Sequence, residues 1–337
     1  MKIKLRHSFE DIISVENLLE AWKEFLNGKR NRKDVQEFSL HLMDNIFSLH
    51  KNLFNLSYKH GEYQSFNICD PKPRKIHKAM VKDRLLHHAL CRKLSPFFDK
   101  TFIVDSYSCR LNKGTHRAIN RFRAFAYKVS KNHTKTCWVL KCDIHKFFAS
   151  INHLILFDVL KQYIFDQNIL WILKQVIDSF EVRTGLGLPL GNFTSQLFAN
   201  IYMNELDQFA KHKLRVQHYI RYADDFVLMT ENKKWLEAQI SFIRNFLKER
   251  LALKLHSDKI SIKSIASGID FLGWIHFSDH RILRTSTKRK MMKRIKESTT
   301  PETLNSYLGL LSHGNTHKVK KNVLRTYILN QDEPNQY

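Results

Sequence analysis

Apolar side chains recur at helical spacing along much of this chain. In the first sixty residues the pattern includes Leu18, Trp22 and Phe25, which share one face of a helix. It predicts a helical region over residues 9–57, interrupted by a basic loop at 28–33. By the same criterion we expect helices in three later segments: 154–180, 194–213 and 234–251.

Shorter apolar runs between these helices predict strands. Residues 137–142 form a nearly continuous apolar run, as in a buried strand, and residues 219–229 show two apolar runs around a short polar turn. Further strands are expected near 259–265 and 269–277. The order strand, helix, helix, hairpin, helix, strand is typical of a split βαβ unit, an α+β sheet with helices on one face. This topology brings the end of the first strand beside the central hairpin.

The charge of the chain indicates a polyanionic partner. Its 337 residues include 56 Lys and Arg against 32 Asp and Glu, a formal net charge of +24. Such an excess favours nucleic-acid binding through counterion release; a ribosome-associated protein or a membrane-surface binder is the alternative. At 43% hydrophobic residues, a chain of this length is expected to form two or three subdomains.

Cysteine spacing and hydropathy indicate the cellular environment of the protein. The five cysteines form no C-x-x-C pair, so neither a zinc site nor a disulfide framework is expected. No apolar run approaches the ~20 residues of a membrane span, and the N-terminus lacks the apolar stretch of a signal peptide. We therefore expect a reduced, cytoplasmic protein without a membrane partner.

The hairpin at 219–229 carries adjacent carboxylates, Asp224 and Asp225, between apolar flanks and without a glycine. A plain acidic turn is one interpretation. The other is a magnesium site, which accounts for two negative charges pressed against a buried sheet. Asp143, directly after the first strand, is by itself typical of a helix cap or turn, but in the predicted sheet it lies opposite the Asp pair. Three carboxylates there would bind two Mg²⁺ ions, with Mn²⁺ as an alternative, for nucleotidyl transfer.

The residues around these acids resemble a known family. Tyr222-Ala223-Asp224-Asp225 resembles the Y-x-D-D motif of reverse transcriptases, and Asp143-Ile144-x-x-Phe147-Phe148 resembles their first catalytic motif. The resemblance implies an α+β right-hand polymerase with fingers, palm and thumb. It also implies metal ligation by four residues: Asp143, Ile144, Asp224 and Asp225.

The same resemblance implies a division of the chain. We expect an N-terminal helical extension at 1–60 and fingers at 61–135, with part of 155–190. The palm is expected at 136–276 and a basic helical thumb at 277–337. Residues 268–274 resemble the primer-grip hairpin. No long domain follows residue 277, so we expect a polymerase that relies on other proteins for strand cleavage and targeting.

Other residues take expected roles from the resemblance. Arg110, Arg84 and Lys113 of the fingers would contact the incoming triphosphate, although each also fits a solvated basic face. Phe148 matches the gate that excludes a ribose 2′-hydroxyl and is equally compatible with a core aromatic. Lys259 matches the lysine that protonates the leaving pyrophosphate, and a general acid is chemically reasonable there.

A loop upstream of the hairpin narrows the resemblance. Leu190 stands where most reverse transcriptases carry Gln, and Gln196 stands where they carry Pro. This pattern resembles the reverse transcriptases of diversity-generating retroelements, which copy a template RNA with frequent errors opposite adenine. Leu190 cannot form the hydrogen bonds of Gln, which should weaken discrimination between correct and incorrect pairs by ~1–3 kcal/mol; simple loop packing is the alternative. The substrate-contacting residues implied in this loop are Leu190, Gly191, Ser195 and Gln196.

The implied partners are the template RNA, the cDNA/RNA hybrid, deoxynucleoside triphosphates and a small basic accessory protein that forms a pentameric ring. The implied location is the cytoplasm of a bacterial or phage-infected cell. Two alternatives stay open. One is a retron, group II intron-like or phage-defence reverse transcriptase, and the other is a non-catalytic RNA-binding protein on a polymerase fold.

Overall fold

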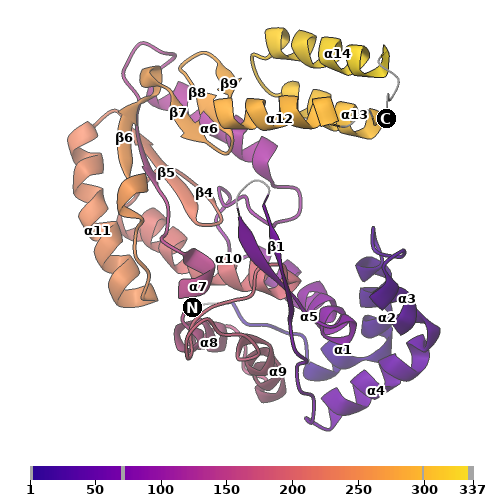
Figure 1. Cartoon of the computed structure of the whole chain (residues 1–337). Helices are drawn as coiled ribbons and strands as arrows, with labels where there is room; N and C mark the ends of the chain where they lie inside the picture. The colour runs from indigo at the N-terminus through magenta and orange to yellow at the C-terminus, as the bar shows by residue number, and fades with distance from the viewer. Residues whose placement is uncertain (1–2, 70–72, 298–299, 333–337) are drawn as a thin grey trace.

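The N-terminal region is helical, as its apolar spacing predicts. The computed structural model describes residues 3–69, 73–297 and 300–332, and its first four helices lie together at one end of the molecule (Figure 1). Ser8 and Ser14 cap the first two by accepting hydrogen bonds from backbone N–H groups. The four helices are α1 (Phe9–Ile13), α2 (Val15–Phe25), α3 (Lys33–Leu40) and α4 (Leu42–Phe54).

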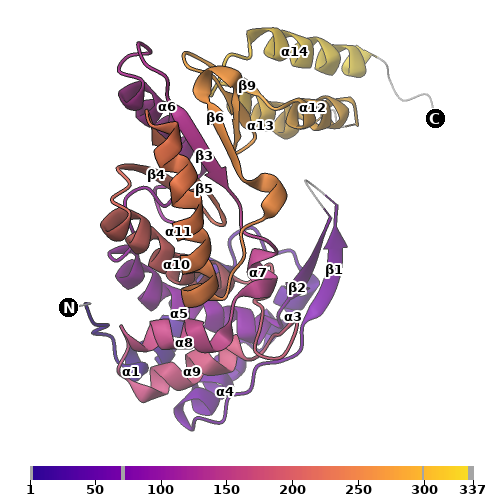
Figure 2. The ribbon, with the colours of Figure 1, turned by 90° about the vertical axis from the view of Figure 1, so that its left-hand side faces the viewer.

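An exposed hairpin and two longer helices follow. β1 (Gln64–Ile68) and β2 (Arg74–Lys78) pair antiparallel and project as a two-stranded arm (Figure 2). α5 (Val81–Asp99) packs against α2, and α6 (Thr115–Val129) lies beside the central sheet. The sequence pattern did not reveal β1 and β2 because their side chains are mostly exposed and lack a buried alternating face.

The central sheet has the topology expected of the split βαβ unit. It is antiparallel, and in its register Cys142 pairs with Phe226, which places the residue after the first strand beside the hairpin turn. The strands have the order β4-β5-β3-β6 and are β3 (Trp138–Cys142), β4 (His218–Tyr222), β5 (Asp225–Thr230) and β6 (Ser261–Ser264). The strand predictions in these segments are confirmed.

The helices around the central strands follow the order that the sequence indicates, with one difference. The prediction of one continuous helix over 154–180 is wrong, because the chain turns before Asp166, whose carboxylate caps a second helix by accepting from two backbone N–H groups. The helices are α8 (His153–Lys161), α9 (Gln167–Ile177), α10 (Phe193–Gln208) and α11 (Lys233–Leu251). α10 continues as a π-helical turn over Phe209–Lys213.

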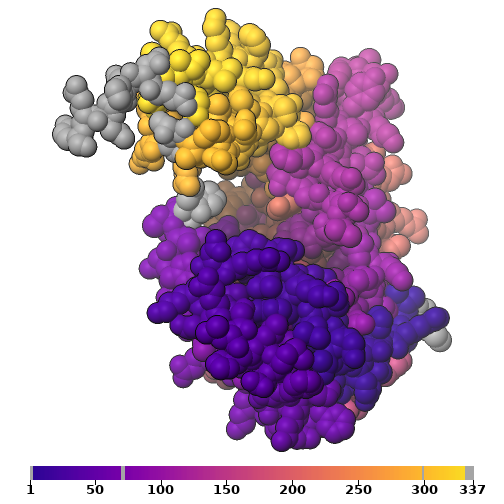
Figure 3. Space-filling model, turned by 90° about the vertical axis from the view of Figure 1, so that its right-hand side faces the viewer, coloured from indigo at the N-terminus to yellow at the C-terminus, as the bar shows by residue number. Residues whose placement is uncertain are grey.

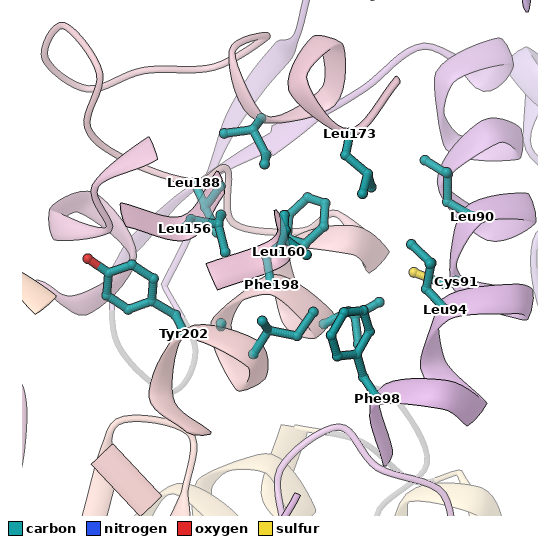
Figure 4. Packing of buried hydrophobic residues seen from close by; sticks show 14 of the residues in the cluster. Leu90, Cys91, Leu94, Phe98, Leu156, Leu160, Leu173, Leu188, Phe198 and Tyr202 are labelled. Atoms are coloured by element: carbon teal, nitrogen blue, oxygen red, sulfur yellow. The ribbon is translucent and has the colours of Figure 1, made fainter. Parts of the chain in front are cut away.

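Both faces of the central sheet are buried. Leu140 and Leu228 belong to the larger hydrophobic cluster, in which side chains of α5, α8, α9 and α10 pack together (Figure 4). Val139 and Val227 belong to a second cluster that includes Phe122 of α6. Burial on both faces accounts for the nearly continuous apolar run at 137–142.

The C-terminal part combines a small sheet with three helices. Leu272 and Gly273, both with positive φ, form the turn of its first hairpin within the predicted strand segment 269–277. The elements are β7 (Ile269–Phe271), β8 (Trp274–His276), β9 (Arg281–Leu283), α12 (Thr285–Glu297), α13 (Pro301–Leu311) and α14 (His317–Asp332). The surface is hollowed between these helices and the N-terminal ones (Figure 3). Over the described ranges, no helix is both long and apolar enough to cross a membrane.

Candidate active site

The β4–β5 hairpin carries two carboxylates at its turn. Tyr222 and Asp225 pair in register, so the turn itself consists of Ala223 and Asp224. Ala223 has a φ of 56°, in the left-handed region, which costs a non-glycine residue about 1–2 kcal/mol. The surrounding contacts therefore hold the turn in a conformation that the isolated chain would avoid.

The segment after β3 brings Asp143 to the same edge of the sheet. The His256 N–H donates to the Asp143 carbonyl at 2.8 Å, and the His145 N–H donates to the Lys254 carbonyl at 2.9 Å. These two bonds pair the backbone at Asp143–His145 with the segment at 254–256, which precedes Lys259. Lys259 Nζ donates to Asp143 Oδ1 at 2.8 Å. Lys259 and Asp143, which the resemblance places in one catalytic site, are thus in direct contact.

A pocket of about 420 Å³ lies beside these acids. Lys141 Nζ lies 3.8 Å from Asp225 Oδ1 and donates to the Asp270 carbonyl at 2.8 Å. Arg284 Nε donates to the Asp270 carboxylate at 2.8 Å. The lining includes Lys141, Asp143, Asp225, Lys259, Asp270 and Arg284. Cationic side chains therefore surround the acids, as a site for a polyphosphate requires.

The acids at the turn resist ionisation. Burial raises the pKa of Asp224 to about 6, and the negative charges of Asp143 and Asp225 add to that shift. Burial also raises the pKa of Asp225, while the positive charge of Lys141 opposes the increase. Clustered negative charge without full compensation is typical of a site that binds cations.

The donor set fits a cation that shares its ligands with substrate. Within residues 3–69, 73–297 and 300–332, no three His, Cys, Asp or Glu side chains are grouped closely enough to hold an ion by themselves. Asp225 Oδ1, however, is buried without a hydrogen-bond partner, an acceptor that an ion would satisfy. Mg²⁺ keeps several waters and takes only one or two carboxylates together with substrate phosphates. Asp143, Asp224 and Asp225 therefore suit Mg²⁺ or Mn²⁺ bound with a nucleotide.

Ile144 belongs to this edge through its backbone. Its side chain is buried. The backbone groups of its neighbours Asp143 and His145 form the hydrogen bonds to His256 and Lys254. Ligation through the Ile144 carbonyl stays a prediction.

Three predicted triphosphate contacts lie away from the pocket beside the acids. Arg84 pairs with an aspartate of α3. Arg110 donates to the Asp99 carboxylate at 2.6 Å and to the carbonyls of neighbouring residues, and its side chain is 6% exposed. Lys113 Nζ donates to a backbone carbonyl at 2.7 Å. Arg84 thus joins the expected fingers to the N-terminal helices, and Arg110 ties two segments within the fingers. The triphosphate role expected for them stays a prediction.

Phe148 and Leu190 lie on connected segments. The Phe148 carbonyl accepts a hydrogen bond from the Leu188 N–H at 2.8 Å, and the Leu190 carbonyl accepts one from the His77 N–H of β2 at 3.0 Å. Gly191 has a φ of 113°, and a Cβ there would meet a side chain of β2. The loop is therefore attached to the arm formed by β1 and β2, and the side chain of Phe148 is half-buried against the core.

Ser195 and Gln196 occupy different environments on α10. Ser195 is buried, whereas Gln196 lines a second pocket, of about 560 Å³, together with Arg110. The structure thus brings Asp143, Asp225 and Lys259 to one pocket and Gln196 to another.

Sequence reasoning missed two cations beside the acids, Lys141 and Arg221. Each interrupts the apolar run of a central strand, Lys141 in β3 and Arg221 in β4. A charged residue inside a buried strand requires a partner, and that signal was available in the sequence.

Comparison with known proteins identifies the family of the chain. Residues 64–276 match the family model described as "Reverse transcriptase (RNA-dependent DNA polymerase)". Protein YkfC of Escherichia coli (strain K12) is 26% identical over 260 residues, with 66% of each chain covered. The group II intron-encoded protein LtrA of Lactococcus lactis subsp. cremoris is 21% identical over 300 residues, covering 68% of this chain and 47% of LtrA.

Solved structures show the same fold. Telomerase from Candida albicans, in a complex with a fragment of telomeric RNA, matches with a TM-score of 0.52 at 12% identity, covering 82% of this chain and 56% of that one. Apo telomerase from Candida tropicalis gives a TM-score of 0.52, with coverage of 81% and 58%. The chain thus has the α+β right-hand polymerase fold and spans no more than about two thirds of these relatives.

Proposed function

The chain belongs to the reverse transcriptase family, and on this basis we propose that it is an RNA-directed DNA polymerase. The observation that carries the proposal is the meeting of Asp143, the Asp224–Asp225 turn and Lys259 at one edge of the central sheet. A non-catalytic RNA-binding protein has no need for three buried or half-buried acids whose charges repel one another. Primer extension on an RNA template tests the proposal.

The chain's own residues divide the work of nucleotidyl transfer. Asp143, Asp224, Asp225 and the Ile144 carbonyl would hold two Mg²⁺ ions, which when bound lower the pKa of the primer 3′-hydroxyl and neutralise the triphosphate. Lys259 neutralises Asp143 before substrate binds and donates a proton to the leaving pyrophosphate. Lys141 stands between Asp225 and β7, where its positive charge favours the ionised form of the acid.

We assign the parts of the hand as the motifs indicate. The N-terminal extension is 1–60, the fingers are 61–135 with part of 155–190, the palm is 136–276 and the thumb is 277–337. Trp274 is buried against α12, α13 and α14, which is consistent with a primer-grip hairpin on which the thumb helices pack. Residues 298–299 and 333–337 of the proposed thumb lie outside the described residues.

Within the family, we assign the chain to the diversity-generating retroelements. Leu190 and Gln196 support this assignment, and the anchoring of the Leu190 loop to β2 gives Leu190 a fixed position from which to affect base pairing. The proposed product is cDNA with errors opposite template adenine. The proposed partners are the template RNA, the cDNA/RNA hybrid, deoxynucleoside triphosphates and a small basic pentameric accessory protein, in a bacterial or phage-infected cell.

A second assignment is favoured by a specific observation. LtrA, a group II intron-encoded protein, matches over 68% of this chain, so an intron-like reverse transcriptase with the same chemistry is the alternative. The error spectrum of the cDNA separates the two. Errors concentrated opposite adenine support the retroelement assignment, whereas evenly distributed rare errors support the intron-like one.

A further inference from the structure

Arg221 is a fully buried cation near the end of β4. Its guanidinium forms a bidentate pair with Asp207 at the end of α10, in which Nε donates to Oδ1 at 2.8 Å and Nη2 donates to Oδ2 at 2.7 Å. Asp207 is likewise fully buried and also accepts a hydrogen bond from the Tyr219 hydroxyl at 2.8 Å. A bidentate, hydrogen-bonded pair of this kind requires the planar fork of arginine.

The other three N–H groups of Arg221 reach beyond the ion pair. Nη2 donates to Ser106 Oγ at 3.0 Å, and Nη1 donates to Asn200 Oδ1 at 3.2 Å. Nη1 also donates to the carbonyl of Ala223 at 3.0 Å. All five donors of the guanidinium are therefore used, and one of them bonds the left-handed residue that immediately precedes Asp224.

The backbone of Arg221 ties the same place to the fingers. Its N–H donates to the Asp105 carbonyl at 3.0 Å, and its carbonyl accepts from the Tyr107 N–H at 2.9 Å. Asn200 Nδ2 donates to the Ser108 carbonyl at 2.9 Å. The segment 105–108, the end of α10 that carries Asp207 and the β4–β5 hairpin thus meet around Arg221.

We propose that Arg221 is a positioning residue for Asp224. Its bond to the Ala223 carbonyl, braced by Asp207, holds the turn in its strained conformation and so fixes the direction in which the Asp224 carboxylate points. A buried ion pair is by itself a weak source of stability and is often replaceable by apolar side chains. The hydrogen bond from Arg221 to the Ala223 carbonyl is a contact that an apolar replacement cannot make. The inference rests on the proposed polymerase function.

The test compares Arg221→Lys with Ser106→Ala in steady-state primer extension on an RNA template. Lysine keeps the charge opposite Asp207 but lacks the fork that reaches Ala223. We expect Arg221→Lys to lower kcat about 10- to 100-fold with little change in the KM for the nucleotide, because small misplacements of a catalytic group have effects of this size. Ser106→Ala removes a different bond of the same guanidinium and should change kcat less than about twofold. Template-RNA binding and near-UV circular dichroism report folding in each variant.

A folded Arg221→Lys protein with the kcat of the unchanged chain overturns the inference, as does an equal loss in Ser106→Ala. If Arg221→Lys does not fold, the double variant Arg221→Met/Asp207→Leu, which leaves no unpaired buried charge, takes its place. A folded double variant with lost kcat supports the inference. If the double variant has unchanged kcat, or also fails to fold, the Arg221–Asp207 pair serves stability alone and the inference is overturned. Absence of primer extension by the unchanged chain is a separate result, which refutes the proposed function.

Discussion

Lys259 Nζ lies 2.8 Å from Asp143 Oδ1, so the proposed proton donor and the proposed metal ligand share one ion pair. The lysine side chain is 41% exposed, whereas the aspartate is 14% exposed. Lys259 can therefore turn toward a phosphate leaving group while Asp143 stays in place. In the free protein the same contact lowers the electrostatic cost of clustering three acids.

Lys259→Met tests the role of this lysine as a general acid. We expect kcat for primer extension to fall about 100-fold with little change in RNA binding, because positioned proton donors contribute on that scale. Lys248→Met, on an exposed turn of α11, removes the same charge and serves as the control. An unchanged rate for Lys259→Met would exclude the role.

Asp224→Asn tests the electrostatic cost of the turn. The pKa of Asp224 is about 6 in the folded chain and 3.8 when unperturbed, so the folded state binds more protons between these values. Stability should therefore fall as pH rises from about 4 to 6 and stay low at pH 7. Without divalent ions at pH 7, Asp224→Asn should raise the free energy of unfolding by about 1–3 kcal/mol. Urea denaturation measures it.

The control for this experiment is Asp158→Asn, which changes an exposed carboxylate of α8. It should shift the free energy of unfolding by less than about 0.5 kcal/mol. A destabilised Asp224→Asn protein at pH 7 would show that the carboxylate is held by favourable contacts rather than strained by its neighbours.

Phe148→Ala tests the proposed sugar gate. The ring is half-buried against the core, and the Phe148 backbone bonds the segment that carries Leu190. If the ring is the gate, its removal should open space at the ribose and permit ribonucleotide incorporation. Primer extension with ribonucleoside triphosphates measures the change. Continued rejection by a folded, active variant would place the gate elsewhere.

Leu190→Gln tests the proposed cause of inaccurate copying. A glutamine at this position restores polar contacts that report the geometry of the base pair, worth ~1–3 kcal/mol of discrimination. Misincorporation should fall, most clearly opposite template adenine, as sequencing of the cDNA would show. An error spectrum identical to that of the unchanged chain would refute the assignment for Leu190.

Much of the catalytic edge was predictable from local sequence. The apolar flanks of Asp224–Asp225 and the run before Asp143 identified three strands, because a strand buried on both faces leaves a continuous apolar signal. The topology then placed the acids together. The turn before Asp166 was not visible, since the link at 162–166 between α8 and α9 is itself largely apolar and its polar signal is the capping carboxylate.

Contacts between distant segments were harder to predict. The motif around Arg110 predicts a contact with the triphosphate, yet its guanidinium is bound to Asp99 at the end of α5. Arg221 shows the converse, because its partners Asp207, Asn200 and Ser106 come from parts of the chain that only the fold brings together. The β1–β2 arm escaped prediction because its strands bury little surface.

Primer extension on an RNA template by Asp225→Ala, in parallel with the unchanged chain, tests the central claim most directly. Asp225 lines the pocket beside the acids and has a buried oxygen without a hydrogen-bond partner. We predict that the unchanged chain extends a DNA primer in Mg²⁺, whereas Asp225→Ala binds the same RNA and shows no extension. Extension by Asp225→Ala at the rate of the unchanged chain would contradict the account.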